Sequence, residues 1–286
     1  MKKLMKKLLL LVATLLLVLG LSNAYAIPVT LDVDKLYDWG RLYSYSAGVY
    51  TPTNVNPAPF GTNPAGGYTI PENTFGNVDG AEDTWGIGTV SRIEEILTGN
   101  PIFQRSGTQE LTFMFYGFDD DALSSPDFVG DTTILSKLGH ISAYLDVTPD
   151  FNGTLGTGGR TGVSAYSGVT DGLLVLDLAP VDLSGSGHTL TSGFDFLTSS
   201  GNGAMYLATT GLGAWDSVYD TNTQLYGSDL SFTFTVRDNS NTPVGNWVVR
   251  GDAGGEANVI PEPTSMLLFG IGMAGLAVTK KRKKIA

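Results

Sequence analysis

The chain has no cysteine and only two histidines among its 286 residues. Without cysteine it cannot form disulfides, use a thiol nucleophile or bind zinc or iron through sulfur. His140 and His188 lie in different segments, so imidazole groups for a zinc site or for acid-base catalysis are scarce. These absences remove several common classes of enzyme and metal site.

Basic residues are almost missing from the middle of the chain. Nine of the 17 Lys and Arg lie at the two ends, which leaves eight between residues 27 and 259. The same region contains 27 Asp and Glu, so its formal charge is −19, compared with −11 for the whole chain. Such a surface repels a phosphate backbone, and we expect no nucleic-acid partner.

The N-terminus has the parts of a secretory signal. Four lysines open the chain, residues 8–21 form an apolar run, and Ala24 and Ala26 form a small-x-small triplet. The run has fourteen residues, fewer than the roughly 20 that a spanning helix needs. We therefore predict residues 1–26 as a signal peptide cleaved before Ile27, with the mature protein outside the cytoplasm.

The C-terminus combines a second apolar run with a basic block. Residues 264–279 are mostly apolar and, as a helix, would extend about 24 Å, somewhat less than a hydrocarbon core of about 30 Å. The block consists of Lys280, Lys281, Arg282, Lys283 and Lys284. The positive-inside rule places this block, in residues 280–286, in the cytoplasm and the acidic body outside. The pattern predicts a C-terminal transmembrane helix.

Three residues before this run give the C-terminus a family resemblance. Pro261, Glu262 and Pro263, followed by a glycine-containing apolar helix and a basic cluster, resemble the PEP-CTERM sorting tail of Gram-negative bacteria. The resemblance covers residues 261–286. It implies recognition by an exosortase, cleavage near Pro261–Pro263, a transient membrane anchor, and delivery to the cell surface or to an exopolysaccharide matrix. The tail specifies delivery and leaves the activity of the body open.

The body reads as strands joined by turns. Residues 230–236 and 141–147 alternate apolar and polar side chains, whereas residues 111–118 are apolar on both faces, as in a covered central strand. Further predicted strands are residues 29–33, 42–50, 173–178, 204–209 and 246–250. Many short antiparallel strands predict an all-β fold, an antiparallel β-sandwich or jelly roll.

Turn and helix signals complete the domain prediction. Glycine occurs 33 times between residues 27 and 259, about twice its usual frequency of about 7%. Residues 51–71 and 152–162 are predicted as loops, and residues 91–97 as one short helix with a capping-box spacing. We expect one β-rich domain over residues 27–250, followed by a flexible spacer at residues 251–260.

Two acidic clusters are the nearest approach to a metal site. They consist of Asp79, Glu82 and Asp83 in the first and Asp119, Asp120 and Asp121 in the second. Carboxylates on loops suit calcium, but neither cluster has the spacing of a known calcium loop, and each also fits a solvated turn. Calcium is the one cofactor that the sequence leaves open.

Other catalytic patterns are weak. Paired carboxylates could hydrolyse glycosides, yet sequence does not supply the distance between them. Ser184 and Ser186 precede His188 in a Gly/Ser loop that lacks a nucleophile elbow. Aromatic residues gather early in the body, with Trp39, Tyr43, Tyr45, Tyr50 and Phe60, and three tryptophans follow at positions 85, 215 and 247. They suit either the core of a sheet or a sugar-binding face.

The sequence therefore favours a non-enzymatic protein of the cell surface or extracellular matrix, structural or adhesive in a biofilm. A carbohydrate-binding β-sandwich module, with or without calcium, is the first alternative. A secreted hydrolase is the second. The expected partners are the exosortase, the membrane and an exopolysaccharide.

Overall fold

The computed structural model describes the body of the chain with some gaps. The described residues are 26–40, 43–46, 49–52, 82–123, 131–183, 185, 187–195, 200–238, 247 and 249–260. Residues 1–25, which include Ala24 of the predicted cleavage site, and the whole sorting tail from Pro261 onward lie outside them. The predictions of signal cleavage, of the apolar helix at residues 264–279 and of the basic block therefore stay predictions. Within the described residues, no helix has the length and apolar character needed to cross a membrane.

Strands dominate the described residues. The long ones are β1 (Ile27–Gly40), β4 (Thr84–Glu95), β6 (Glu110–Leu123), β7 (Asp131–Asp146), β10 (Leu173–Pro180), β12 (Ser200–Thr209), β13 (Leu230–Asp238) and β14 (Val249–Val259). The short ones are β2 (Tyr43–Ser46), β3 (Val49–Pro52), β5 (Pro101–Gln104), β8 (Arg160–Gly162), β9 (Ala165–Tyr166) and β11 (Leu190–Asp195). Three short helices complete the set: η1 (Gly153–Gly159), α2 (Asp216–Tyr219) and η2 (Leu225–Gly227).

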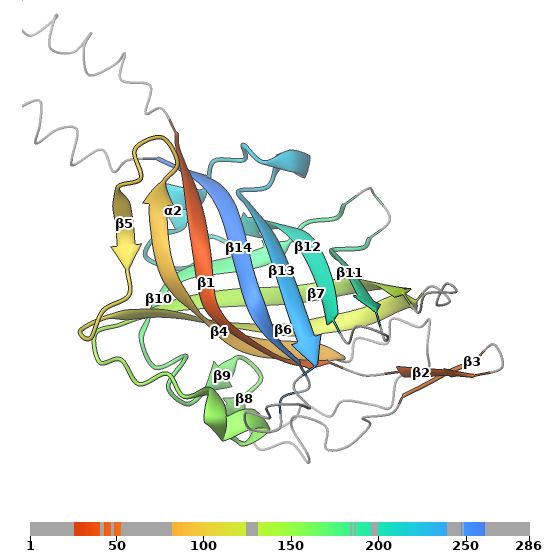
Figure 1. Cartoon of the computed structure of the whole chain (residues 1–286). Helices are drawn as coiled ribbons and strands as arrows, with labels where there is room; N and C mark the ends of the chain where they lie inside the picture. The colour runs from red at the N-terminus through yellow and green to blue at the C-terminus, as the bar shows by residue number, and fades with distance from the viewer. Residues whose placement is uncertain are drawn as a thin grey trace, which may run out of the picture. The chain divides into compact units, whose positions relative to one another are not determined.

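The strands form one main sheet that closes on itself. Its order is β1-β14-β13-β12-β10-β7-β6-β4-β5, and an additional pairing joins β1 to β4. Strand β11 pairs with both β12 and β7, and the hairpins β2–β3 and β8–β9 stand apart. Figure 1 shows β1, β14 and β13 side by side in front, with β6, β7 and β10 crossing behind them.

The all-β antiparallel class is confirmed, whereas the prediction of a sandwich or jelly roll needs correction. A sandwich has two separate sheets, but here β4 pairs with β1 along one edge and with β5 and β6 along the other. The sheet thus has no break at that point. Alternation in a sequence reveals which face of a strand is buried, but it does not reveal which edges pair.

The inside of the closed sheet is filled by apolar side chains. Phe113 from β6 meets Phe232 from β13 edge to face, with ring centroids 6.2 Å apart. On β4, Gly88 leaves room for the Phe113 ring, which a Cβ at that position would strike. The interior cavity that Phe113 and Phe232 help to line has a volume of about 50 Å³. Since ligand pockets usually have about 300–1,000 Å³, this cavity is too small for one.

A second apolar core covers the outer face of β4 and β6. This outer cluster consists of Trp85, Ile87, Met114, Tyr166, Val169 and Trp247. Residues 150–172, with η1, β8 and β9, lie over it: the Trp247 Nε1–H donates to the Gly153 carbonyl at 2.7 Å, and the Thr112 hydroxyl donates to the Val169 carbonyl at 2.6 Å. The prediction that residues 111–118 form a strand covered on both faces is confirmed.

Two other predictions of local structure are wrong. Residues 91–97 do not form a helix, because β4 continues to Glu95 and Ile93 pairs with Leu31 of β1 and Phe103 of β5. Pairing on both edges and burial of Ile93 outweigh the local capping signal. Most of the predicted flexible spacer, residues 251–260, belongs to β14, where each of its glycines pairs with a residue of β13.

The predicted loops and the domain boundary change accordingly. Residues 152–162 contain η1 and β8, and residues 51 and 52 end β3, while residues 53–71 lie outside the described part. The body forms one compact unit, Pro28–Asn258, so it extends past the predicted limit at Arg250. Its last strand is held by the ladder with β13, which the glycine-rich sequence did not suggest.

Candidate functional site

The two predicted acidic clusters meet at the pairing of β4 with β6. Thr84 lies opposite Phe118, and the Asp83 N–H donates to the Phe118 carbonyl at 2.7 Å, which brings Glu82 and Asp83 beside Asp119. All three carboxylate side chains are fully buried. The sequence identified these residues as loop carboxylates, whereas the structure places them inside packed protein.

Glu82 neutralises a buried arginine. Its Oε1 and Oε2 lie 2.5 and 2.9 Å from Nη1 and Nη2 of Arg160, and Oε2 also accepts the Gly117 N–H at 2.7 Å. Arg160 lies 4.3 Å from the centre of the Trp85 ring. Burial raises the pKa of Glu82, and the bonds from Arg160 and Gly117 oppose that rise. This pair ties residues 150–172 to the start of β4.

The prediction of calcium at these two clusters stays a prediction. Asp79 lies outside the described residues, and Asp120 and Asp121 are described only as backbone of β6.

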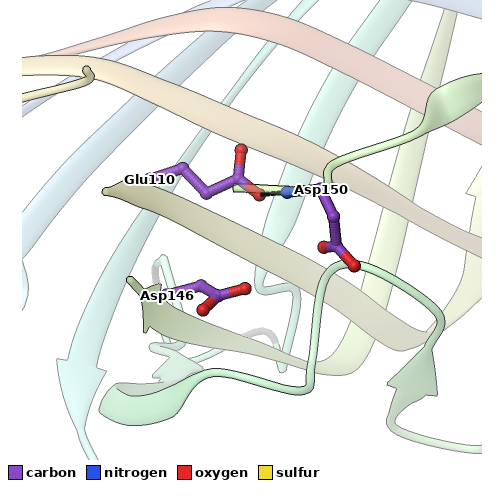
Figure 2. Close-up of side chains that lie close together, drawn as sticks. All are labelled: Glu110, Asp146 and Asp150. Carbon is purple, nitrogen blue, oxygen red and sulfur yellow. Dashed lines mark hydrogen bonds between the residues drawn. The ribbon is translucent and has the colours of Figure 1, made fainter. Parts of the chain in front are cut away.

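A third acidic cluster was not predicted from the sequence. Carboxylate oxygens of Glu110, Asp146 and Asp150 lie within 4.8 Å of one another, as Figure 2 shows. Glu110 and Asp146 face each other in the β6–β7 register. Asp150 follows four residues after Asp146. Both strands were predicted, so the missing signal was the register, which would have placed the start of one strand beside the end of the next.

The hydrogen bonds of Glu110 show what this cluster does structurally. Its Oε1 accepts the N–H groups of Asp150 and Phe151 at 2.7 and 2.8 Å, and its Oε2 accepts from Arg105 at 3.3 Å. Partial desolvation raises the pKa of the Asp150 carboxyl, and the negative charges of Asp171, Asp146 and Glu110 raise it further. Three oxygens could contribute to a calcium site, which usually has six to eight oxygen ligands. The direct role of Glu110 is to hold the start of residues 150–172.

Around His140, the nearby hydroxyl group is directed to a carboxylate. The Ser142 hydroxyl donates to Oδ1 of Asp177 at 2.6 Å, so its proton points to a carboxylate instead of an imidazole. His140 is stacked on Tyr116, with centroids 5.7 Å apart, and its Nδ1 lies 4.0 Å from Asp177 Oδ2. Ser184 and Ser186, which precede His188, lie outside the described residues.

The tryptophans at positions 85 and 247 belong to the core. Trp85 and Trp247 are buried in the outer cluster, with ring centroids 5.1 Å apart. The side chains of Trp39, Tyr43, Tyr45 and Tyr50 and the whole of Phe60 lie outside the described residues. The buried rings of Trp85 and Trp247 are therefore not available to stack on a sugar.

A polar trough lies on the outer face of the sheet, away from the strands that bear the outer cluster. It has a volume of about 630 Å³ and is lined by residues of β7, β11, β12, β13 and β14. Its lining residues are Thr133, Thr191, Ser192, Gly193, Asn202, Gly203, Ala204, Thr233, Phe234, Thr235, Asp252, Ala253 and Gly254. They are mostly small or polar, and they come from segments 120 residues apart in the sequence.

Cross-strand register aligns the polar groups of the trough. Gly193, Asn202, Thr235 and Asp252 lie opposite one another across β11, β12, β13 and β14. Thr133 extends this row onto β7, opposite Gly193. Asn202, Thr235 and Asp252 are exposed, so hydroxyl, amide and carboxylate groups face solvent in one line. Among the described residues that line the trough, Asp252 is the only charged one.

The C-terminal tail was compared with known protein families. The family model for the PEP-CTERM protein-sorting motif matches residues 259–283. The chain carries a PEP-CTERM sorting signal. The match begins at the last residue of β14 and includes Pro261, Glu262, Pro263 and the apolar run. No curated protein and no solved structure matches the chain significantly. The PEP-CTERM signal marks the chain as an exported protein that is directed to an exosortase.

Proposed function

We propose that the body is a non-enzymatic adhesive protein of the extracellular matrix and that it binds a neutral polysaccharide in the trough. The sorting signal supports the location, because a PEP-CTERM tail directs an exported protein to the exosortase at the membrane. The observation that carries the binding proposal is the aligned row of polar groups across five strands.

The chemistry of the trough selects its ligand class. Threonine hydroxyls and the Asn202 amide can donate and accept hydrogen bonds, as the hydroxyl groups of a sugar require. Asp252 and the absence of Lys and Arg among the lining residues disfavour an anionic polymer. A volume of about 630 Å³ falls within the usual range for ligand sites, about 300–1,000 Å³.

A binding assay with paired variants tests this proposal. The processed protein is incubated with neutral matrix polysaccharide, and the bound fraction is measured by co-sedimentation. Asn202→Ala combined with Thr235→Ala should abolish saturable binding, whereas Thr161→Ala, an exposed threonine on β8 outside the trough, should leave it unchanged. Equal binding by the double variant and the parent protein would refute the assignment.

A chelator distinguishes calcium-assisted binding of polysaccharide from binding that needs no calcium. The Glu110 cluster lies at the start of β6, the end of β7 and the residues that follow β7, while the trough is built mainly from β11 to β14. We expect EDTA to leave polysaccharide binding unchanged. A loss of binding that calcium restores would favour the calcium-assisted module. Release of reducing sugar during the same assay would instead favour the hydrolase.

A tail variant tests the delivery step. Replacing Pro261, Glu262 and Pro263 with alanine should leave an uncleaved chain in the membrane fraction, visible as an intact mass that includes the tail. Deletion of the exosortase should give the same product. Normal cleavage and location in both strains would contradict the role of this motif.

A further inference from the structure

Two exposed apolar segments flank the point where β14 leaves the sheet. The first is the tip of the β4–β5 hairpin, where Ile96, Leu97 and Ile102 are exposed, Leu97 to 82%. The second contains Leu225 and Tyr226 of η2, which are 62% and 58% exposed. These five residues are called the collar.

Hydrogen bonds place both segments at the same end of the sheet. The Ile96 N–H donates to the Pro28 carbonyl at 2.9 Å, at the start of β1, the neighbour of β14. On the other side, the Asn258 amide donates to the Thr223 hydroxyl at 2.6 Å, and Ala257 pairs with Leu230. Figure 1 shows the start of β1, the end of β14 and the β4–β5 hairpin at one end of the sheet.

The collar is uncharged in a strongly acidic body. Residues 96–104 (ILTGNPIFQ) and 221–228 (TNTQLYGS) contain no Asp, Glu, Lys or Arg. Segments without charge and with exposed leucine and tyrosine favour contact with an apolar or interfacial phase. Glu95 and Asp220 directly precede the two segments, so a lipid surface without net charge suits them better than an anionic one.

The collar flanks the end of β14, which is close in sequence to the predicted membrane segment, so lipid is its expected contact. Asn258 is six residues before Thr264, where the predicted membrane segment begins, a distance of about 20 Å even when fully extended. A chain anchored through residues 264–279 therefore keeps this end of the sheet close to the lipid headgroups. We infer that the collar inserts into the membrane surface while the tail is uncleaved. This inference rests on the proposed membrane anchoring of the tail.

The trough would then lie farther from the lipid than the collar. Asp252 precedes Asn258 by six residues along β14, about 20 Å of strand. A body held at the membrane by the collar would leave the trough open to the matrix before and after cleavage.

The absence of cysteine allows a direct test with single-cysteine variants of the full chain. Leu97→Cys and Leu225→Cys place an environment-sensitive fluorophore in the collar. Leu138→Cys is the matched control: Leu138 is 54% exposed and lies opposite Phe118, which pairs with Thr84 at the other end of β4. Thr84 and Glu95 are eleven residues apart, about 36 Å along the strand.

The labelled chains are reconstituted in phosphatidylcholine vesicles, with and without nitroxide-labelled lipid. We expect severalfold stronger quenching and a blue-shifted emission at positions 97 and 225 than at position 138. In the Leu225→Cys chain, Leu97→Ser with Ile102→Ser should lower the quenching, and Leu138→Ser should not.

Two results would overturn the inference. Chains that float with the vesicles but show equal quenching at all three positions would retain the anchor and reject the collar. Chains that do not float with the vesicles would reject the anchored state, and the collar contact with it. Neither result affects polysaccharide binding by the processed protein, which is measured without lipid.

Discussion

The closed sheet has two outer faces that differ in what covers them. On β4 and β6, residues 150–172 cover the outer cluster, and Arg160 pairs with Glu82 beneath that cover. On β11 to β14, threonine, asparagine and glycine face solvent in the trough. Both faces belong to one sheet, so strand pairing does not distinguish them. Apolar side chains on an outer face must be covered by another segment, whereas small polar side chains can remain in contact with solvent or a ligand.

The largest predicted effect concerns the ion pair under the cover. Arg160→Met should lower the free energy of unfolding by about 3–5 kcal/mol, because Glu82 would remain buried without its countercharge. The matched control is Arg92→Met, since Arg92 forms a partly exposed pair with Glu94 at 2.6 Å; its loss should cost about 1 kcal/mol. Urea denaturation measures both. Equal losses of unfolding free energy in the two variants would mean that the Glu82–Arg160 pair does not hold residues 150–172 on the sheet.

The second effect compares side chains on the two faces. Met114→Ala should destabilise the protein by about 2–5 kcal/mol, because it leaves a cavity in the outer cluster. Thr235→Ala, on the trough face, should change stability by no more than about 0.5 kcal/mol. Thermal and urea unfolding of the two variants provide the measurement, and a costly Thr235→Ala would show that the trough is structural.

A smaller effect is expected where the cover begins. Glu110→Gln keeps the size of the side chain but weakens the bonds from the Asp150 and Phe151 N–H groups, so a loss of about 1–3 kcal/mol is expected. Hydrogen exchange should show faster opening of residues 150–172 with the trough strands unchanged. Uniform acceleration across the sheet would contradict a local role.

The smallest effect is the pH dependence of Asp150. Its folded-state pKa is raised, so deprotonation as the pH rises through that pKa lowers stability relative to the protonated form. Asp150→Asn should therefore match the parent protein below about pH 4 and have a slightly higher Tm at neutral pH. Because Asp150 is exposed, salt should reduce the difference. A Tm difference that does not vary with pH would show that neither desolvation nor the neighbouring carboxylates raise the pKa of Asp150.

Much of the strand content was predictable from side-chain alternation. Leu230, Phe232, Phe234 and Val236 point to one face, as expected, and residues 111–114 are buried on both faces of their strand. Glycine was the misleading signal. Gly88 and Gly203 lie within strands, where the rings of Phe113 and Phe234 occupy the space that a Cβ would take. A glycine next to a ring from another strand looks the same in sequence as a glycine in a turn.

The candidate sites were less predictable, because they depend on register. Glu82 and Asp119 were identified as acidic, but the partner of Glu82, Arg160, lies 78 residues away. Glu110 and Asp146 meet only through the β6–β7 ladder. The trough contains no motif at all, since each strand contributes one to three unremarkable residues.

The β class, the C-terminal sorting signal and the acidic character of the body could be recognised in the sequence, because these depend on local patterns and composition. The tertiary structure decided the closure of the sheet, the conversion of residues 251–259 from apparent spacer to strand, and the separation of a covered face from a bare one. Those features arise from backbone pairing between distant segments and from side chains that fill or leave the space between them. Neither is encoded at any single position.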